Sequence, residues 1–346
     1  MGVYIVRRLL QTIPILLFLS IIFFILINLV PGGPLAGHGR SRHIRPERVE
    51  LLKRQFGLDK PLPLQYVIWL IGNDWMKVDT DGDGIAEGYG ERKGILRGDF
   101  GFSFTTRQPV MHEIMLRLPA TIYLMSVTLI IVALIAIPIG VISAVRQYST
   151  FDISVTTLSF MGQAIPEFWF GLILILVFYA WLENPVTGES LLPPGGMHTI
   201  GTEFSIWDWV KHLILPVTMG ALGWVAWYTR FLRAGMLDVI HRDYIRTARA
   251  KGLPERRVLY KHALKNGLIP LVTIFALDVP YIFAGSLYVE LLFSWPGMGR
   301  LYYQSAMDRD YPLLMAILIF STTAVILANL LADVAYAYLD PRIRYD

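Results

Sequence analysis

The sequence contains no cysteine, so disulfide bonds, thiolate metal sites and cysteine nucleophiles are excluded. Charged residues are also scarce: Asp, Glu, Lys and Arg make up only 17% of the 346 residues, whereas 54% are hydrophobic. A water-soluble domain of this size carries more charge and less apolar surface. The composition therefore predicts a membrane protein.

Motifs of several enzyme classes are missing as well. No glycine-rich loop ends in Gly-Lys-Ser/Thr, so the chain offers no site that would cradle the phosphates of ATP. His112-Glu113 continues into Ile-Met rather than completing a His-Glu-x-x-His zinc motif, and no Gly-x-Ser-x-Gly elbow occurs. We predict that the chain is not an enzyme, with no catalytic residue and no intrinsic cofactor.

Six apolar runs are each long enough to cross a bilayer, which takes about 20 residues. The predicted fold is an all-α polytopic membrane protein with six transmembrane helices. The first run, of about 22 residues, exceeds the apolar core of a signal peptide and is expected to be retained as a span. The expected spans are Leu9–Val30, Leu118–Ile142, Ser154–Trp181, Leu213–Leu232, Leu268–Leu292 and Pro312–Ala335.

The short loops predict the orientation of these spans. Basic residues precede the first span and follow the second, whereas the connection 182–212 is mostly acidic, so both termini are expected in the cytoplasm. The basic residues of 31–117 do not oppose this, because loops longer than about 60 residues largely escape the positive-inside rule. We predict three segments: 1–30 with span one, 31–117 as a small external cap, and 118–346 as the transmembrane core, with a short cytoplasmic tail.

Alternating acids in the predicted cap resemble a calcium-binding loop, in which oxygens at positions 1, 3, 5, 7 and 9 surround the cation. Position 12, where a bidentate Glu is expected, is Gly90 instead. A solvated acidic turn is therefore an equal alternative to a structural Ca²⁺ site. The candidate ligands are Asp79, Asp81, Asp83, Ile85 and Glu87.

Two acids fall inside predicted spans. Glu167 follows Pro166, which is expected to kink span three, and Asp278 lies about ten residues into span five. Because a buried charge in a bilayer is costly, such acids usually face protein or water, and both are candidates for lining a translocation path. Helix packing for Glu167, and pairing with a polar group on a partner for Asp278, are the alternatives.

The segment Asp243–Pro270 is strongly basic and lies between two apolar runs. On a continuous helix Ala248 and Gly252 would share one face, forming a small spot that a soluble partner could approach closely. Leu253-Pro254 is expected to end this helix, and Glu255 to begin another. A positive loop that only fixes topology is the alternative.

Several motifs of the chain, taken together, are specific. Asp243–Gly252, with Asn266-Gly267-Leu268-Ile269-Pro270, resembles the "EAA" coupling loop of bacterial ABC-importer permeases, more narrowly of the dipeptide/oligopeptide/nickel family. Arg246 stands where the loop's name has Glu, and the Ile-Pro pair falls later than in the general consensus, as is usual for the peptide branch. Further matching landmarks are Leu192–Gly196, Glu290, Phe293–Gly299, Arg309–Pro312, Asn329–Asp333 and Leu339–Arg342.

This resemblance implies a first-permease subunit of a peptide importer in the cell inner membrane. Its partners would be a homologous second permease, two ATP-binding subunits that carry ATP and Mg²⁺, an external solute-binding protein and membrane lipid, with no nucleic acid. A coupling helix in segment 234–266 would dock on an ATPase. The coupling residues it implies are Tyr244, Arg246, Thr247, Ala248, Arg249, Ala250, Lys251, Gly252 and Leu253.

A stand-alone secondary transporter or channel is the competing function, with Glu167 and Asp278 as a proton relay. Such transporters often contain internal repeats with broken helices in matching positions. The sequence shows no convincing repeat across the six spans, and a self-contained transporter needs no coupling segment. The importer interpretation is therefore preferred.

Overall fold

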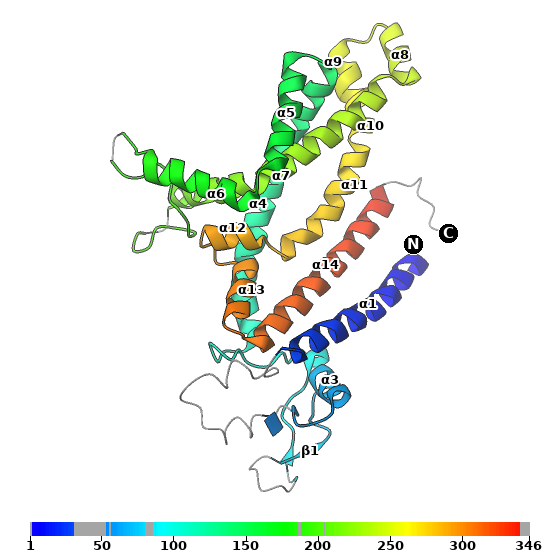
Figure 1. Ribbon diagram of the computed structural model, residues 1–346. Coiled ribbons are helices and arrows are strands. Elements are labelled where there is room, and N and C mark those ends of the chain that lie inside the picture. The colour runs from blue at the N-terminus through cyan, green and yellow to red at the C-terminus, as the bar shows by residue number, and fades with distance from the viewer. Residues whose placement is uncertain are drawn as a thin grey trace. The chain divides into compact units, whose positions relative to one another are not determined.

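The computed structural model describes residues 2–30, 53–54, 57–79, 86, 88–185, 188–203 and 205–339, and nearly all of its elements are helices (Figure 1). The prediction of an all-α protein is confirmed. The chain divides into two compact units. Unit 1 holds the described residues up to Pro119 together with Leu301–Ile326, and unit 2 holds Ala120–Arg300 and the described residues from Leu327 onward. These units do not coincide with the predicted segments, and the external cap stays a prediction.

Four helices in the described part of the chain are long and apolar enough to cross a membrane, and the number rises to six if each of two bent pairs is one span. The predicted spans one, two, four and six fall on the four long helices. Two of these helices continue well beyond the predicted spans, because amphipathic turns extend the apolar runs. The four are α1 (Gly2–Asn28), α4 (Val110–Val145), α7 (Ile206–Ile240) and α14 (Tyr311–Leu339).

The predicted third span is broken rather than merely kinked. Helix α5 (Thr150–Ala164) is followed by α6 (Glu167–Ile175) and the π-helical turn η4 (Leu176–Trp181), and the two halves meet at 98°. Pro166 provides no backbone N–H, and the residue before it, Ile165, is extended with ψ 125°. The break places Glu167 at the first turn of α6, where the chain changes direction.

The predicted fifth span ends earlier than expected. Helix α11 (Ile269–Asp278) narrows into a 3₁₀ turn, η6 (Val279–Phe283), and the chain then turns at Gly285, whose φ of +74° favours glycine. A separate short helix, α12 (Leu287–Leu292), follows. The expectation of one continuous span to Leu292 is therefore wrong, because the run of apolar residues does not reveal the turn at Gly285.

Buried hydrogen bonds hold α12 to the segment that follows it. Glu290 is fully buried and accepts from Thr121 Oγ1 at 2.9 Å and from the backbone N–H of Arg300 at 3.1 Å. Thr121 Oγ1 in turn accepts from the N–H of Met298 at 2.6 Å, at the start of α13 (Met298–Met307). The buried carboxylate thereby closes the tight Trp295-Pro296-Gly297 turn within unit 2.

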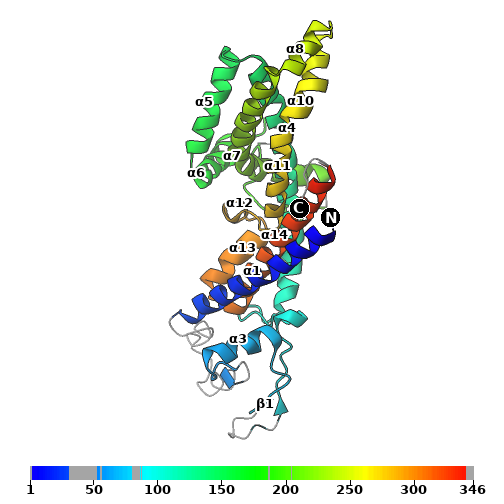
Figure 2. The same cartoon turned by 90° about the vertical axis from the view of Figure 1, so that its right-hand side faces the viewer.

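Unit 1 joins α1 and the first part of α14 to smaller elements. The two helices lie side by side in both views (Figures 1 and 2), and Phe24 and Ile27 pack against Tyr311 and Met315. The remaining elements are α3 (Leu62–Ile71), the antiparallel pair β1 (Lys77–Val78) and β2 (Gly88–Tyr89), and the 3₁₀ turn η3 (Ile95–Arg97).

A buried carboxylate ties the loop after η3 to the start of α14. Asp310 is 1% exposed and accepts hydrogen bonds from Ser103 Oγ at 2.5 Å and from the backbone N–H of Thr105 at 3.1 Å. The same side chain caps α14 through the N–H of Leu313 at 3.4 Å. This polar anchor holds the loop against the start of α14.

We expect Asp310→Ala to lower the thermal stability of the protein, because it leaves the buried Ser103 hydroxyl and Thr105 amide without their acceptor. Each lost partner costs about 1–3 kcal/mol. The matched control is Asp308→Ala, which removes an exposed acid two residues away. Thermal unfolding of both variants in detergent checks the prediction, and equal melting temperatures would contradict it.

Candidate functional site

The predicted coupling segment folds as a short helix that follows a sharp turn at the end of α7. Helix α8 (Asp243–Ala250) buries Ile245 completely and leaves Ala248 only 7% exposed. Both side chains join a hydrophobic cluster that includes Met236 of α7 and Val258. One face of α8 therefore anchors the helix to unit 2, which Figure 1 shows at the end of that unit beside α9 (Glu255–Arg257).

The opposite face of α8 is polar and open. The exposed side chains carry one aromatic ring and several cations but, on the helix itself, only one acid, Asp243 at its start. Such a face suits a partner that presents acidic groups. The exposed coupling residues are Tyr244, Arg246, Thr247, Arg249, Ala250, Lys251 and Gly252.

An ion pair fixes the turn after α8. Arg249 Nη2 lies 2.7 Å from Glu255 Oε1, and hydrogen bonding to that carboxylate raises the pKa of Arg249. Between them Gly252 adopts φ +73°, and half-buried Leu253 packs against the same cluster as Ala248. Beyond α9 the chain continues through the π-helical turn η5 (Val258–Ala263) and α10 (Leu264–Gly267).

The predicted small-residue spot does not form. Helix α8 ends at Ala250, so Gly252 lies in the turn, while Ala248 faces the core of the protein itself. The physical reason is that Ile245 and Ala248, three residues apart, lie on the same face and are buried together. In the sequence, the spacing of Ile245 and Ala248 indicated which face of the helix packs against the protein. The small size of Ala248 and Gly252 did not.

The two intramembrane acids are brought together. Glu167 and Asp278 both line a cavity of about 340 Å³ in unit 2, together with Thr128, Tyr281 and Tyr288. Asp278 also accepts a hydrogen bond from the hydroxyl of Tyr228. Residues 111 positions apart in the sequence thus line one mostly apolar cavity and give it two carboxyl groups.

A buried ion pair of unit 2 was missed in the sequence. Arg233 of α7 binds Asp152 of α5 through two hydrogen bonds, Nε to Oδ1 at 2.5 Å and Nη2 to Oδ2 at 2.7 Å. Asp152 lies two residues before the predicted third span, and only the structure places it in the first turn of a helix, α5.

The candidate calcium loop cannot be assembled from the described residues. Asp79 lies 2.6 Å from Arg54 Nη1, so its carboxylate already meets a cation. The other candidates, Asp81, Asp83, Ile85 and Glu87, fall outside the described residues, and within the described part no group of three metal-ligating side chains gathers. The calcium site stays a prediction.

The protein has long apolar helices, a short polar helix anchored by one buried face, and a cavity lined by two carboxyl groups. These are features of a polytopic membrane permease. The family model "Binding-protein-dependent transport system inner membrane component" matches residues 136–345, and its N-terminal counterpart matches residues 1–125. The chain therefore belongs to this family of inner-membrane permease subunits of ABC importers. It is a multi-pass component of the inner membrane.

Full-length relatives agree with this assignment. The chain is 43% identical over 100% of both proteins to the oligopeptide transport system permease protein AppB of Bacillus subtilis (strain 168). It is 36% identical to the dipeptide transport system permease protein DppB of Escherichia coli (strain K12), over 99% of this chain and 98% of that protein. The di/tripeptide transport system permease protein DppB of Pseudomonas aeruginosa (strain UCBPP-PA14) is likewise 36% identical, over 99% of this chain.

Membership in this family decides between the two predicted classes in favour of the importer subunit over a stand-alone secondary transporter. The prediction that the chain is a transport subunit and no enzyme is confirmed on the same ground. The family also implies a partner permease, ATPase subunits that hydrolyse ATP, and a substrate-binding protein.

Proposed function

We propose that this chain forms half of the translocation path of a peptide importer and couples it to ATP hydrolysis through α8. The observation that carries the proposal is the two-sided character of α8, with Ile245 and Ala248 buried in unit 2 and a polar, cationic face open. A helix held firmly on one side can transmit a push applied to the other. The names of the relatives support di- and oligopeptides as the solute class.

The proposed complex contains a homologous second permease, two ATPase chains and an external solute-binding protein. Both termini and α8 lie in the cytoplasm in this arrangement, and residues 31–117 form the external cap. Closure of the ATPases moves α8 and tilts the spans, which opens the central cavity outward, and the return step releases solute inward. The cycle is a two-state device biased by different contacts in each state.

The coupling residues divide into two roles within this proposal. Tyr244, Arg246, Thr247, Arg249, Ala250, Lys251 and Gly252 meet the ATPase. Ala248 and Leu253 support the helix from inside and do not touch the partner.

Co-purification tests the proposed assembly. The chain is tagged in its native cell, the membrane is solubilised gently, and mass spectrometry identifies what is recovered. A second six-span permease with ATPase chains is the expected result. A lone chain or plain homodimer, recovered in several detergents, would contradict the proposal.

The acids of the central cavity give a further prediction. We expect Glu167→Gln with Asp278→Asn to slow peptide uptake about tenfold, the loss expected when polar contacts to charged groups of a solute are removed. Asparagine keeps an oxygen for Tyr228, so assembly should persist. Uptake in proteoliposomes is the measurement, and Glu183→Gln, an exposed acid outside this cavity, is the control. Unchanged uptake in the double variant would assign both acids to packing.

A further inference from the structure

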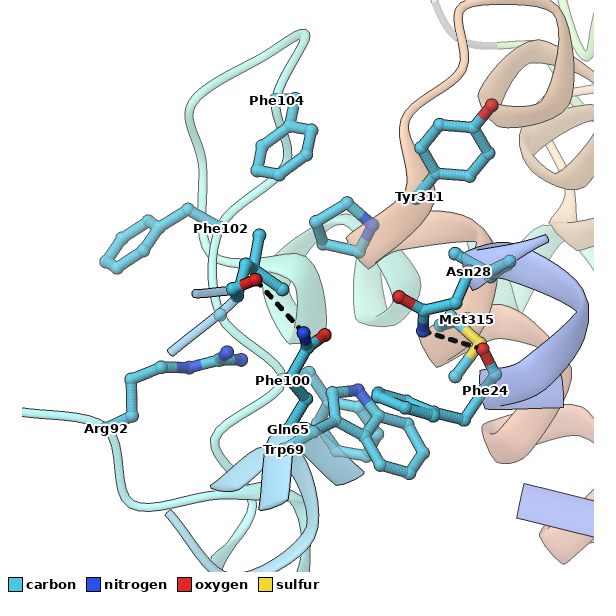
Figure 3. Close-up of a pocket in the computed structure, with 14 residues that line it drawn as sticks. Phe24, Asn28, Gln65, Trp69, Arg92, Phe100, Phe102, Phe104, Tyr311 and Met315 are labelled. Atoms are coloured by element: carbon cyan, nitrogen blue, oxygen red, sulfur yellow. Dashed lines mark hydrogen bonds between the residues drawn. The ribbon is translucent and has the colours of Figure 1, made fainter. Parts of the chain in front are cut away.

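Unit 1 contains a pocket that takes no part in the transport cycle proposed above. It lies where the C-terminal end of α1 meets the N-terminal end of α14, with α3 and the loop after β2 completing its walls (Figure 3). Its volume is about 70 Å³, so it admits a compact polar group. The aromatic walls are Phe24, Trp69, Phe100, Phe102, Phe104 and Tyr311.

Two polar side chains in this pocket are suited to a ligand. Arg92 points into the pocket in Figure 3, and burial lowers the pKa of its guanidinium, although Asp99 acts in the opposite direction. Arginine stays protonated nevertheless. Gln65 donates through Nε2 to the carbonyls of Leu58 and Lys60 at 3.0 and 2.7 Å, while its Oε1 is buried and accepts no hydrogen bond from any residue the structure describes.

The charges of the lining favour an anion in this pocket. The described residues that line it include Arg92 but no acid. The carboxylate of Asp99 lies outside this lining and accepts hydrogen bonds from the backbone amides of Lys93 at 2.9 Å and Gly101 at 3.0 Å. The pocket therefore offers one cation and one buried acceptor, which together suit an anion that also carries a hydrogen-bond donor.

An apolar groove of about 370 Å³ lies next to this pocket, and Phe24 and Asn28 line both. The groove follows α1 from Asn28 back to Ile21, about 10 Å along the helix axis at 1.5 Å per residue. Ile21, Ile25 and Leu29, which line it, are 40%, 49% and 72% exposed. Helix α1 is long and apolar enough to cross a bilayer, and the polar pocket lies at its C-terminal end, where such a span leaves the hydrocarbon region.

Aromatic side chains at the junction fit this placement. Tyr66 and Trp69 of α3 form a ring cluster with Phe24, with centroids 5.4 to 5.8 Å apart, and Tyr66 OH hydrogen-bonds Ser20 Oγ at 2.8 Å. Tyrosine and tryptophan are typical of the membrane–water interface. The lining thus changes from polar to apolar from the pocket to the groove, as a phospholipid does from headgroup to acyl chain, whereas a peptide segment would require backbone partners within the apolar groove.

We propose that this pocket and groove bind one anionic phospholipid of the phosphatidylglycerol type. The phosphodiester lies at Arg92, a headgroup hydroxyl donates to Gln65 Oε1, and one acyl chain fills the groove along α1. The lipid then fastens α3 and the loop after β2 to the two spans. This site is independent of the coupling helix and of the central cavity.

Native mass spectrometry of the purified importer complex tests the proposal by titration with phosphatidylglycerol in detergent. Arg92→Gln is expected to weaken retention of one lipid about tenfold, as loss of a charge-assisted hydrogen bond does. The control is Lys93→Gln, which removes the same charge from an exposed neighbour that does not line the pocket. Equal lipid retention by the two variants would overturn the proposal.

A second variant tests the groove without touching the headgroup. Leu62 is 55% exposed and lines the groove, so Leu62→Trp should fill it without disturbing the fold and should also reduce lipid retention. If it retains lipid fully while inorganic phosphate still competes, the site binds free anions and the lipid assignment is wrong. Equal retention of phosphatidylcholine, which has no headgroup donor, would mean annular lipid only and would likewise overturn it.

Discussion

Gly252→Trp is expected to leave a folded, membrane-inserted permease in which peptide uptake no longer follows ATP hydrolysis. Gly252 occupies an exposed turn with φ +73°, and a Cβ placed on it would meet no atom within 4 Å. The indole would therefore project from the surface that we assign to the ATPase. It would hold the two proteins apart without disturbing the cluster around Ile245, and uptake should fall at least about tenfold, the loss of a single well-packed interface contact.

Gly252→Ala is the matched control for this variant. Both substitutions place an L-residue in the left-handed region, which costs about 1–2 kcal/mol, but only tryptophan adds bulk. Uptake and ATPase activity are measured in proteoliposomes at equal permease content. The alanine variant should keep most of its uptake. If tryptophan and alanine behave alike, the turn does not contact the ATPase and the coupling surface lies elsewhere.

The membrane spans could be predicted because hydrophobicity over about 20 residues is a local property. The apolar runs therefore located α1, α4, α7 and α14. The 98° break at Pro166 could not be predicted in size, since a proline permits a range of bends and the neighbouring helices select one. The turn at Gly285 was hidden for a similar reason, because glycine is common in spans that stay helical.

Among the functional residues too, local properties could be predicted and those set by tertiary packing could not. The cost of burying charge singled out Glu167 and Asp278, and the structure places both on one cavity. The prediction placed Ala248 on the open face of α8, whereas the apolar spacing of Ile245 and Ala248 turns both side chains into the protein. Asp152 was not predicted to be important, because an acid near the start of a helix is common. Only the structure shows that it is buried, with 2% of the residue exposed.

That burial makes the Asp152–Arg233 pair a sensitive polar contact of unit 2. The Asp152 side chain is 3% exposed and accepts from both Nε and Nη2 of Arg233. Its oxygens also accept from the Ser143 hydroxyl and, at 2.8 Å, from the backbone N–H of Tyr148. The pair thus ties the end of α4 and the start of α5 to α7, whose C-terminal end leads directly into α8.

We expect Arg233→Met to destabilise the permease by about 3–5 kcal/mol, because it leaves a buried carboxylate without its counter-charge. Thermal unfolding of the purified protein, with the yield of folded material, is the measurement. Arg230→Met is the matched control on the same helix. Arg230 bonds Gln163 at 3.0 Å and lies 4.6 Å from the ring of Phe160, with no buried acid, so its loss should cost less than about 1 kcal/mol.

The double variant Arg233→Met with Asp152→Asn distinguishes a stranded charge from lost packing. Asparagine carries no charge to leave unpaired, so the double variant should recover much of the stability lost in Arg233→Met, since replacing both partners of a buried pair is often nearly neutral. An Arg233→Met protein as stable as Arg230→Met would show that water or lipid headgroups reach Asp152. The pair would then be dispensable for holding α5 against α7.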